Sequence, residues 1–192
     1  MKRLSIFVSG NGTNLQRIAE YFSGHRDVEI ALVVCNNPKA YAIERAKNLG
    51  LPLRMVTKQE FGTAAFAEEL RSLDIDLIVL AGFLWKVPEH LIEAFPKRIV
   101  NIHPALLPKY GGKGFYGEHV HEAVVAAKEA QSGITVHYVN ALYDSGEIIL
   151  QARVSLEENE TPDSLAAKIH RLEQAYFPVA IEQVLSLPSQ ER

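Results

Sequence analysis

The feature that most constrains the fold of this 192-residue chain is an alternation along its first hundred residues. Short apolar runs rich in β-branched residues alternate there with segments of helical periodicity. Residues 75–81 contain an unbroken apolar run, which is typical of a strand buried on both faces. Strands that alternate with helices build βαβ units and a mostly parallel sheet. The expected strands are 4–8, 28–35, 53–56 and 75–81, and the expected helices are 15–22, 40–49 and one that contains Phe66, Leu70 and Leu73.

The pattern changes after residue 100. Residues 101–117 are rich in Pro, Gly and His and are too many for a simple connection, which indicates a functional loop. A helix at 119–130, strands at 134–139 and 147–154 and a long last helix opened by Thr161 and Pro162 are expected to follow. We therefore predict one doubly wound α/β domain over 1–192. Its mostly parallel sheet has a Rossmann-type first half, and a β-hairpin-like region and a long C-terminal helix complete the second half.

Composition limits the classes of partner and compartment. The formal net charge is −3, so we expect no nucleic-acid partner. The first apolar run breaks at Ser9 and Gly10, too early for a signal peptide or a membrane helix, so we expect a cytoplasmic protein without a membrane partner. Cys35 is the single cysteine, which excludes an intramolecular disulfide. Its position at the end of an apolar run favours a small core residue over a nucleophile.

A glycine-rich loop at residues 9–14 follows the first expected strand and opens the first helix. Glycines allow a backbone to approach a ligand closely, and the N–H groups at a helix N-terminus bind phosphate. Leu15 stands where the dinucleotide fingerprint has its third glycine, and the loop has no P-loop lysine. The loop therefore favours a monophosphate over NAD or ATP, while the alternative is an ordinary tight βα turn.

Asn101 and His103 end a strand at alternate positions, which places both side chains on one side. An amide and an imidazole that point the same way can serve acyl transfer: the amide stabilises an oxyanion and the imidazole relays protons. Asp144, in a later turn, could support the charge of His103. The alternative is a histidine that only caps a loop.

The sequence gives weaker indications of function for the other histidines. His119 and His121 have a spacing that resembles a metal site, but at a helix start they point in different directions, and we expect a solvated helix end without metal. His137, in the strand at 134–139, could be a core histidine or a substrate contact.

Taken together, these residues resemble the glycinamide ribonucleotide transformylase family, the formyltransferases of purine synthesis. The resemblance covers essentially the whole chain, and its strongest signature is the string 101–110. Supporting strings are 10–14, 80–83 and 144–151. Members of this family transfer the formyl group of 10-formyltetrahydrofolate, a co-substrate, to the amine of glycinamide ribonucleotide on the route to IMP.

The resemblance also implies residue roles. It makes 1–100 a phosphate-binding half and 101–192 a catalytic and folate-binding half. Asn101 and His103 would stabilise the tetrahedral intermediate, and Asp144 would orient His103. Both substrates would be small molecules, no metal would be needed, and the protein would be a monomer or homodimer. The implied substrate phosphate site is Gly12, Thr13 and Asn14, the implied ribose and glycinamide contact is Glu173, and the implied folate site is Leu84, Trp85, Lys86, Val87, Asn101, Val139, Asn140 and Ala141.

The sequence departs from the familiar bacterial pattern in the loop 111–117, at Trp85 and at Ala64. Related activities remain as alternatives. Methionyl-tRNA formyltransferase has an added C-terminal domain and a basic surface, and formyltetrahydrofolate deformylase has an added N-terminal domain. A third alternative is a phosphate-binding module without catalytic activity.

Overall fold

Parallel strands form the sheet of the first part of the chain. The computed structural model describes residues 1–187, and these divide into two compact units. The first unit contains Met1–Val100 and the end of the last helix from Leu185, and the second contains Asn101–Val184. That 1–192 form a single domain stays a prediction.

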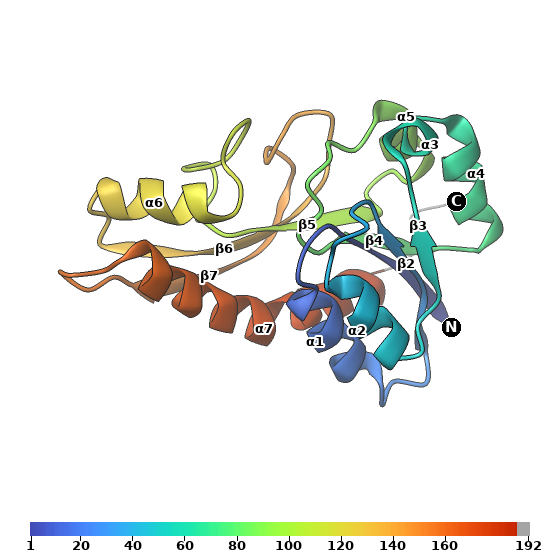
Figure 1. The fold of residues 1–192 in the computed structure, drawn as a ribbon, viewed down its shortest axis with the longest axis horizontal. Coiled ribbons are helices and arrows are strands. Elements are labelled where there is room, and N and C mark those ends of the chain that lie inside the picture. Colours follow the sequence, from blue (N-terminus) through green and yellow to red (C-terminus); the bar gives the residue numbers. More distant parts are fainter. Residues whose placement is uncertain (188–192) are drawn as a thin grey trace. The chain divides into compact units, whose positions relative to one another are not determined.

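The first unit alternates strands and helices in the order that the sequence predicts. In its sheet the strands lie in the order β3-β2-β1-β4, and each neighbouring pair is parallel. Figure 1 shows α1 and α2 together on one side of these strands and α4 and α5 on the other. The elements are β1 (Lys2–Val8), α1 (Thr13–Phe22), β2 (Val28–Cys35), α2 (Ala42–Asn48), β3 (Leu53–Met55), α3 (Lys58–Phe61), α4 (Ala64–Ser72), β4 (Leu77–Leu80), α5 (Glu89–Ala94) and β5 (Ile99–His103), which continues into the second unit.

Apolar periodicity explains where these elements form. All of β4 is buried, as the unbroken apolar run predicts. In α1 the buried residues are Leu15, Ile18 and Phe22, one stripe of the helix that faces the core. The short helices α3 and α5 were not predicted, because four and six residues are too few to show helical periodicity.

An aromatic cluster fills the core of the first unit. Phe7 on β1 is fully buried, and its ring lies 6.3 Å from Phe61, 6.1 Å from Phe66 and 5.3 Å from Phe83, measured between centroids. These tilted and edge-on geometries are the favourable ones for aromatic pairs. Cys35 is fully buried at the end of β2, which confirms the prediction of a core residue, and burial raises the pKa of its thiol.

The second unit is built around an antiparallel pair. Its strands lie in the order β5-β6-β7, and β6 pairs with β7 from Gln131↔Ser155 to His137↔Ile148. A register shift between Val136 and His137 marks an irregularity near the end of β6. Figure 1 shows α6 and α7 flanking this pair. The remaining elements are α6 (Glu118–Ala126), β6 (Gln131–Tyr138), β7 (Ile148–Ser155) and α7 (Pro162–Ser186).

Together these elements confirm the predicted fold class, an α/β protein with a mostly parallel sheet, a hairpin-like antiparallel region and a long C-terminal helix. Gly133 shows how closely β6 and β7 approach, because a Cβ atom there would overlap the Ala152 carbonyl oxygen.

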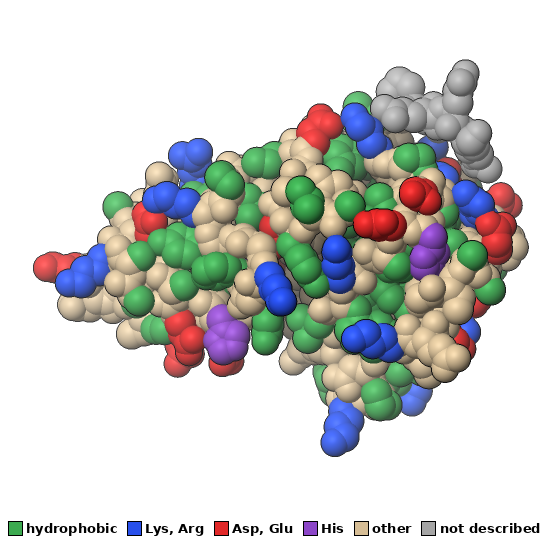
Figure 2. Space-filling model, turned by 90° about the horizontal axis from the view of Figure 1, so that it is seen from above, with side chains coloured by type: hydrophobic (Ala, Val, Ile, Leu, Met, Phe, Trp, Pro, Cys, Tyr) green, Lys and Arg blue, Asp and Glu red, His purple; other side chains and the backbone are tan. Residues whose placement is uncertain are grey.

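The surface carries mixed charge. On the face shown in Figure 2, Lys and Arg side chains are interspersed with acidic and apolar ones and do not gather into one basic patch. Among residues 1–187, no helix is both long and apolar enough to span a bilayer.

We expect Phe7→Ala to lower the free energy of unfolding by about 3–5 kcal/mol, because it opens a cavity in the aromatic cluster. Urea unfolding followed by circular dichroism measures the change. Met55→Ala, at a position 36% exposed, is the control and should change stability far less. Equal losses in the two variants would show that Phe7 is not central to the core.

Candidate active site

Strand β5 carries Asn101 and His103 at alternate positions, so both side chains leave the same face of the strand. His103 is 4% exposed, and Asn101 is half-buried. A hydrogen bond of 3.1 Å joins Asn101 Nδ2 to His137 Nε2 on β6. The end of β5 is therefore connected to the end of β6 by side chains.

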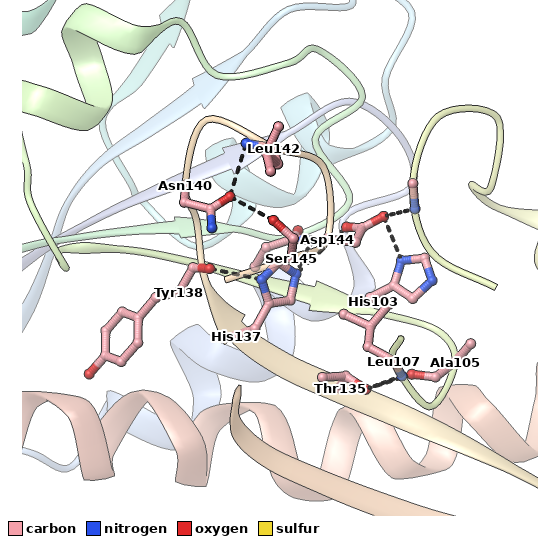
Figure 3. A network of polar contacts seen from close by, with 12 residues as sticks. His103, Ala105, Leu107, Thr135, His137, Tyr138, Asn140, Leu142, Asp144 and Ser145 are labelled. Carbon is pink, nitrogen blue, oxygen red and sulfur yellow. Dashed lines mark hydrogen bonds and ion pairs between the residues drawn. The ribbon is translucent and has the colours of Figure 1, made fainter. Parts of the chain in front are cut away.

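The Asp144 carboxylate lies between two imidazoles (Figure 3). Its Oδ2 is 3.6 Å from His103 Nδ1, and its Oδ1 is 3.6 Å from His137 Nε2. The backbone N–H of Gly112 donates to Oδ2 at 2.9 Å. Spacing in the sequence could not place Asp144 beside His103, and the fold of the second unit does so.

The turn that carries Asp144 is held by its own side chains. Asn140 Oδ1 accepts hydrogen bonds from the backbone N–H of Leu142 at 2.9 Å and from the Ser145 hydroxyl at 3.0 Å. Asp144 has φ +50°, a left-handed conformation that costs energy for a residue with a Cβ atom. The turn therefore maintains a strained backbone at the residue that approaches both histidines.

Gly146 allows this turn to come close to β6. A Cβ atom on Gly146 would overlap the carbonyl oxygen of Tyr138. The segment 139–141, expected to border the folate, lies at the start of the same turn, and its role stays a prediction.

Burial dominates the electrostatics of the histidine. It lowers the pKa of His103, and although the Asp144 charge and the Tyr110 carbonyl raise it, the net pKa lies below its ordinary value. We expected Asp144 to favour the protonated imidazole; the direction is correct, but desolvation outweighs it. Burial raises the pKa of Asp144, yet the interactions with His137 and His103, which stabilise the carboxylate when these imidazoles are protonated, and with the Gly112 N–H prevail and lower it. A neutral imidazole thus faces an ionised carboxylate at neutral pH.

The other nitrogen of His103 is also engaged. Nε2 lies 2.7 Å from the carbonyl oxygen of Tyr110, which can only accept, so Nε2 carries the ring proton in the neutral form. Nδ1 then has a free lone pair toward Asp144, and a proton taken up there would face the carboxylate. Tyr110 belongs to the loop that the sequence marks as functional, and its φ is +56°.

Thr135 and Gln151 were missed by sequence reasoning. The Thr135 hydroxyl donates to the Ala105 carbonyl at 2.7 Å and accepts from the Leu107 backbone N–H at 3.0 Å. Gln151 Nε2 donates to the Thr135 hydroxyl and to the Leu107 carbonyl, both at 3.0 Å. These contacts hold the chain immediately after His103. The alternation of Thr135 with His137 along β6 was the available signal.

In the first unit, the glycine-rich loop ends at the N-terminus of α1. Gly12 is the N-cap residue and has φ +78°. Within residues 1–187 no side chain caps this end, and its first turn carries no acidic residue. The backbone N–H groups that the sequence assigns to phosphate are thus not capped by a side chain.

Arg45 on α2 holds this loop and was not predicted. Its Nε donates to the Asn11 carbonyl at 2.9 Å and its Nη2 to Asn11 Oδ1 at 2.8 Å. A Cβ atom on Gly12 would lie 2.7 Å from Ala42 Cβ. Gly12 is therefore needed for packing against α2, whereas the sequence suggested only room for a phosphate.

The loops after β1 and β4 are joined by Ser9. Its hydroxyl accepts from the Leu84 backbone N–H at 2.9 Å. Trp85 is half-buried, and its ring lies 5.7 Å from Phe61 and 5.9 Å from Phe83. The segment 84–87, expected to bind folate, is therefore supported by the aromatic cluster, and its ligand stays a prediction.

Glu173 lies on α7 beside another histidine. His170 Nδ1 is 3.4 Å from Glu173 Oε2, and this contact raises the pKa of His170. His121 on α6 was expected at a solvated helix end, but it is 7% exposed, and burial lowers its pKa. That expectation was wrong because α6 turns this residue inward, whereas His119 is exposed and contacts Glu122 at 3.2 Å. Within residues 1–187, no group of three or more His, Cys, Asp or Glu could hold a metal ion.

We expect the His103 imidazole to titrate below its ordinary pKa, and Asp144→Asn to move the midpoint to still lower pH. Removing the carboxylate removes the interaction that stabilises the imidazolium, while burial, which favours the neutral ring, remains. NMR of the ring protons against pH measures both midpoints, with exposed His119 as the internal control. A midpoint that rises in Asp144→Asn would contradict this account.

Comparison with known proteins shows to which family the chain belongs. The family model described as formyl transferase matches residues 2–181. Phosphoribosylglycinamide formyltransferase of Bacillus subtilis (strain 168) is 36% identical, with 97% of this chain and 96% of that protein covered. The chloroplastic enzyme of the same name from Arabidopsis thaliana is 39% identical over 93% of this chain, which spans 64% of that relative's length.

A solved structure supports the same family. The crystal structure of glycinamide ribonucleotide transformylase 1 from Geobacillus kaustophilus is 33% identical, superposes with a TM-score of 0.88, and is matched over 97% of this chain and 100% of that one. The family model and these relatives cover nearly all of the chain. The chain therefore belongs to the formyl transferase family.

Proposed function

We propose that this protein transfers the formyl group of 10-formyltetrahydrofolate to the amine of glycinamide ribonucleotide, which yields formylglycinamide ribonucleotide and tetrahydrofolate on the route to IMP. One observation carries the proposal: Asn101, His103 and Asp144 are gathered by β5 and one turn in a family whose members are formyl transferases. The names of the bacterial and plant relatives support this choice of substrate.

The reaction needs an oxyanion donor and a proton carrier. The amine attacks the formyl carbon, so the formyl oxygen becomes negative while the amine nitrogen becomes positive. Asn101 can donate a neutral hydrogen bond to the oxygen. His103, neutral before attack, can accept the amine proton and return it to the folate nitrogen that leaves.

Asp144 acts on the charge that this transfer creates. When His103 takes up a proton at Nδ1, the new N–H faces a carboxylate 3.6 Å away. The interaction is strongest when the imidazole is charged, so it stabilises the intermediate more than the resting state. Asp144 therefore supports the proton relay by orienting and stabilising the His103 cation.

We assign residues of both units to the two substrates. We assign the phosphate to Gly12, Thr13 and Asn14, with Arg45 holding the loop in shape. Glu173 contacts the ribose and glycinamide end. The pterin is bordered by residues 84–87, Asn101 and residues 139–141. No step needs a metal ion, because the amide and the imidazole supply the stabilisation.

The remaining proposals concern the compartment, the oligomeric state and the binding partners of the protein. We propose a cytoplasmic protein, a monomer or homodimer, whose partners are the two small substrates and not nucleic acid or a membrane. The net charge of −3 supports the exclusion of nucleic acid.

A direct assay tests the proposed function. The protein is mixed with 10-formyltetrahydrofolate and glycinamide ribonucleotide, and release of tetrahydrofolate is followed. Release that depends on the ribonucleotide supports the proposal. Release without any amine would identify a formyltetrahydrofolate deformylase, and transfer to methionyl-tRNA would identify a methionyl-tRNA formyltransferase. Absence of any reaction would indicate a phosphate-binding module without catalytic activity.

We expect Asp144→Asn to reduce kcat by roughly two to four orders of magnitude with little change in either KM, because it removes the carboxylate that supports the His103 cation. Asn101→Ala should cost about 3 kcal/mol of transition-state stabilisation, the range for one oxyanion donor. Asp27→Asn, in an exposed position before β2, is the matched control. A kcat near that of the wild type in Asp144→Asn would remove Asp144 from the mechanism.

Thr13→Val tests the phosphate site better than a change at Gly12, which would collide with Ala42. We expect KM for the ribonucleotide to rise about tenfold or more, since a hydrogen bond to a charged group is lost, while KM for the folate stays unchanged. Ser23→Ala, which removes a hydroxyl at the opposite end of α1, should change neither value. Equal weakening of both substrates would mean that the loop only supports the fold.

A further inference from the structure

His137 is a buried histidine that the proposed reaction does not use. It is 2% exposed, lies at the irregular end of β6, and has partners on both ring nitrogens. Nδ1 lies 2.9 Å from the carbonyl oxygen of Tyr138, and Nε2 lies 3.1 Å from Asn101 Nδ2. Figure 3 shows the Tyr138 contact and the ring beside Asp144.

The Tyr138 contact determines the tautomer. A carbonyl oxygen can only accept, so the proton of the neutral ring must be on Nδ1. Nε2 then carries a lone pair and can only accept. Asp144 Oδ1, at 3.6 Å, is beyond hydrogen-bonding distance from Nε2, so the close partner of this lone pair is Asn101.

The tautomer in turn determines the orientation of the Asn101 amide. An amide presents an N–H₂ group on one side and an oxygen on the other, and the two ends have opposite hydrogen-bonding character. A lone pair on His137 Nε2 accepts only from the N–H₂ end. With one N–H held in this way, the second N–H has a defined direction and the amide oxygen is turned away from His137.

We propose that His137 is a positioning residue that fixes the amide orientation of Asn101, so that Asn101 presents an N–H, and not its oxygen, to the formyl oxygen. This inference rests on the proposed formyl transfer. It assigns to His137 an indirect role, through Asn101, without contact with the reacting atoms. An Asn101 amide turned the other way would place a carbonyl dipole against the developing oxyanion and oppose catalysis.

The surroundings of His137 restrict the ring. The Nδ1 atom would lie 3.6 Å from a Cβ atom on Gly146, so the backbone of the Asp144 turn packs close to this edge of the ring. Thr135, two residues earlier on β6, is fully buried and holds the chain after His103. His137 and Thr135 on β6 therefore contact Asn101 on β5 and the chain that follows β5.

Two substitutions at His137 separate its two contacts. Gln places a neutral acceptor near the position of Nε2, and Asn places its amide near Nδ1 but does not reach Asn101. We expect His137→Gln to keep kcat within about threefold of the wild type. His137→Asn should lower kcat roughly tenfold or more, up to the about 100-fold that loss of the Asn101 donor costs, with both KM values nearly unchanged.

A double-mutant cycle identifies the route of the effect. In the Asn101→Ala background, His137→Asn should cost less than about twofold, because the amide that it positions is absent. An undiminished loss in that background, or equal losses for Gln and Asn, would overturn the proposal. Coupling that appears only with Asp144→Asn would instead assign His137 to the carboxylate and would also overturn it.

A measurement without turnover keeps the inference separate from the proposed function. In ¹⁵N NMR of the wild-type protein near neutral pH, the His137 ring should show a protonated Nδ1 and an unprotonated Nε2. The opposite tautomer, or a ring protonated at both nitrogens, would refute the inference even if the enzyme is active. Absence of formyl transfer by the wild type would refute the proposed function and leave this tautomer assignment standing.

Discussion

The polar network of the second unit depends on one half-buried carboxylate. Asp144 lies 3.6 Å from each of two imidazoles that are almost inaccessible to solvent, and a backbone N–H donates to it. Burial disfavours charge on His103, while the carboxylate favours it, and the balance leaves a neutral ring that gains a stabilised charge when it accepts a proton. The strained turn, its Asn140 hydrogen bonds and the close approach at Gly146 serve to keep this carboxylate in place.

The two units supply different chemistry for physical reasons. Parallel strands in the first unit require helical crossovers, and the loop after β1 therefore ends at a helix N-terminus with uncapped backbone N–H groups, judged over residues 1–187. In the second unit the ends of β5 and β6 and the turn between β6 and β7 bring an amide, two imidazoles and a carboxylate together.

At two positions the tertiary structure changes what the sequence suggested. Gly12 is a glycine at a positive φ, as a phosphate loop suggests, but the nearest obstacle to a side chain there is Ala42 of the neighbouring helix. His121 has the spacing of an exposed pair with His119, yet α6 buries it while His119 stays exposed. Gly12 is constrained by a helix that is distant in the sequence, and the burial of His121 depends on which face of α6 packs inward. Neither cause is visible in the local sequence.

The sequence by itself determined the alternation of elements, the mostly parallel sheet, the two candidate loops, and the pairing of Asn101 with His103. These depend on local periodicity and on motifs a few residues long, which the chain displays directly. Only the tertiary structure decided that Asp144 lies beside His103, that His137 accepts from Asn101, and that Arg45 and Ser9 hold the loops of the first unit. These contacts join residues 34 to 75 positions apart in the chain. No sequence period specifies such a distance, because it is set by how strands order within a sheet and by how closely their loops pack.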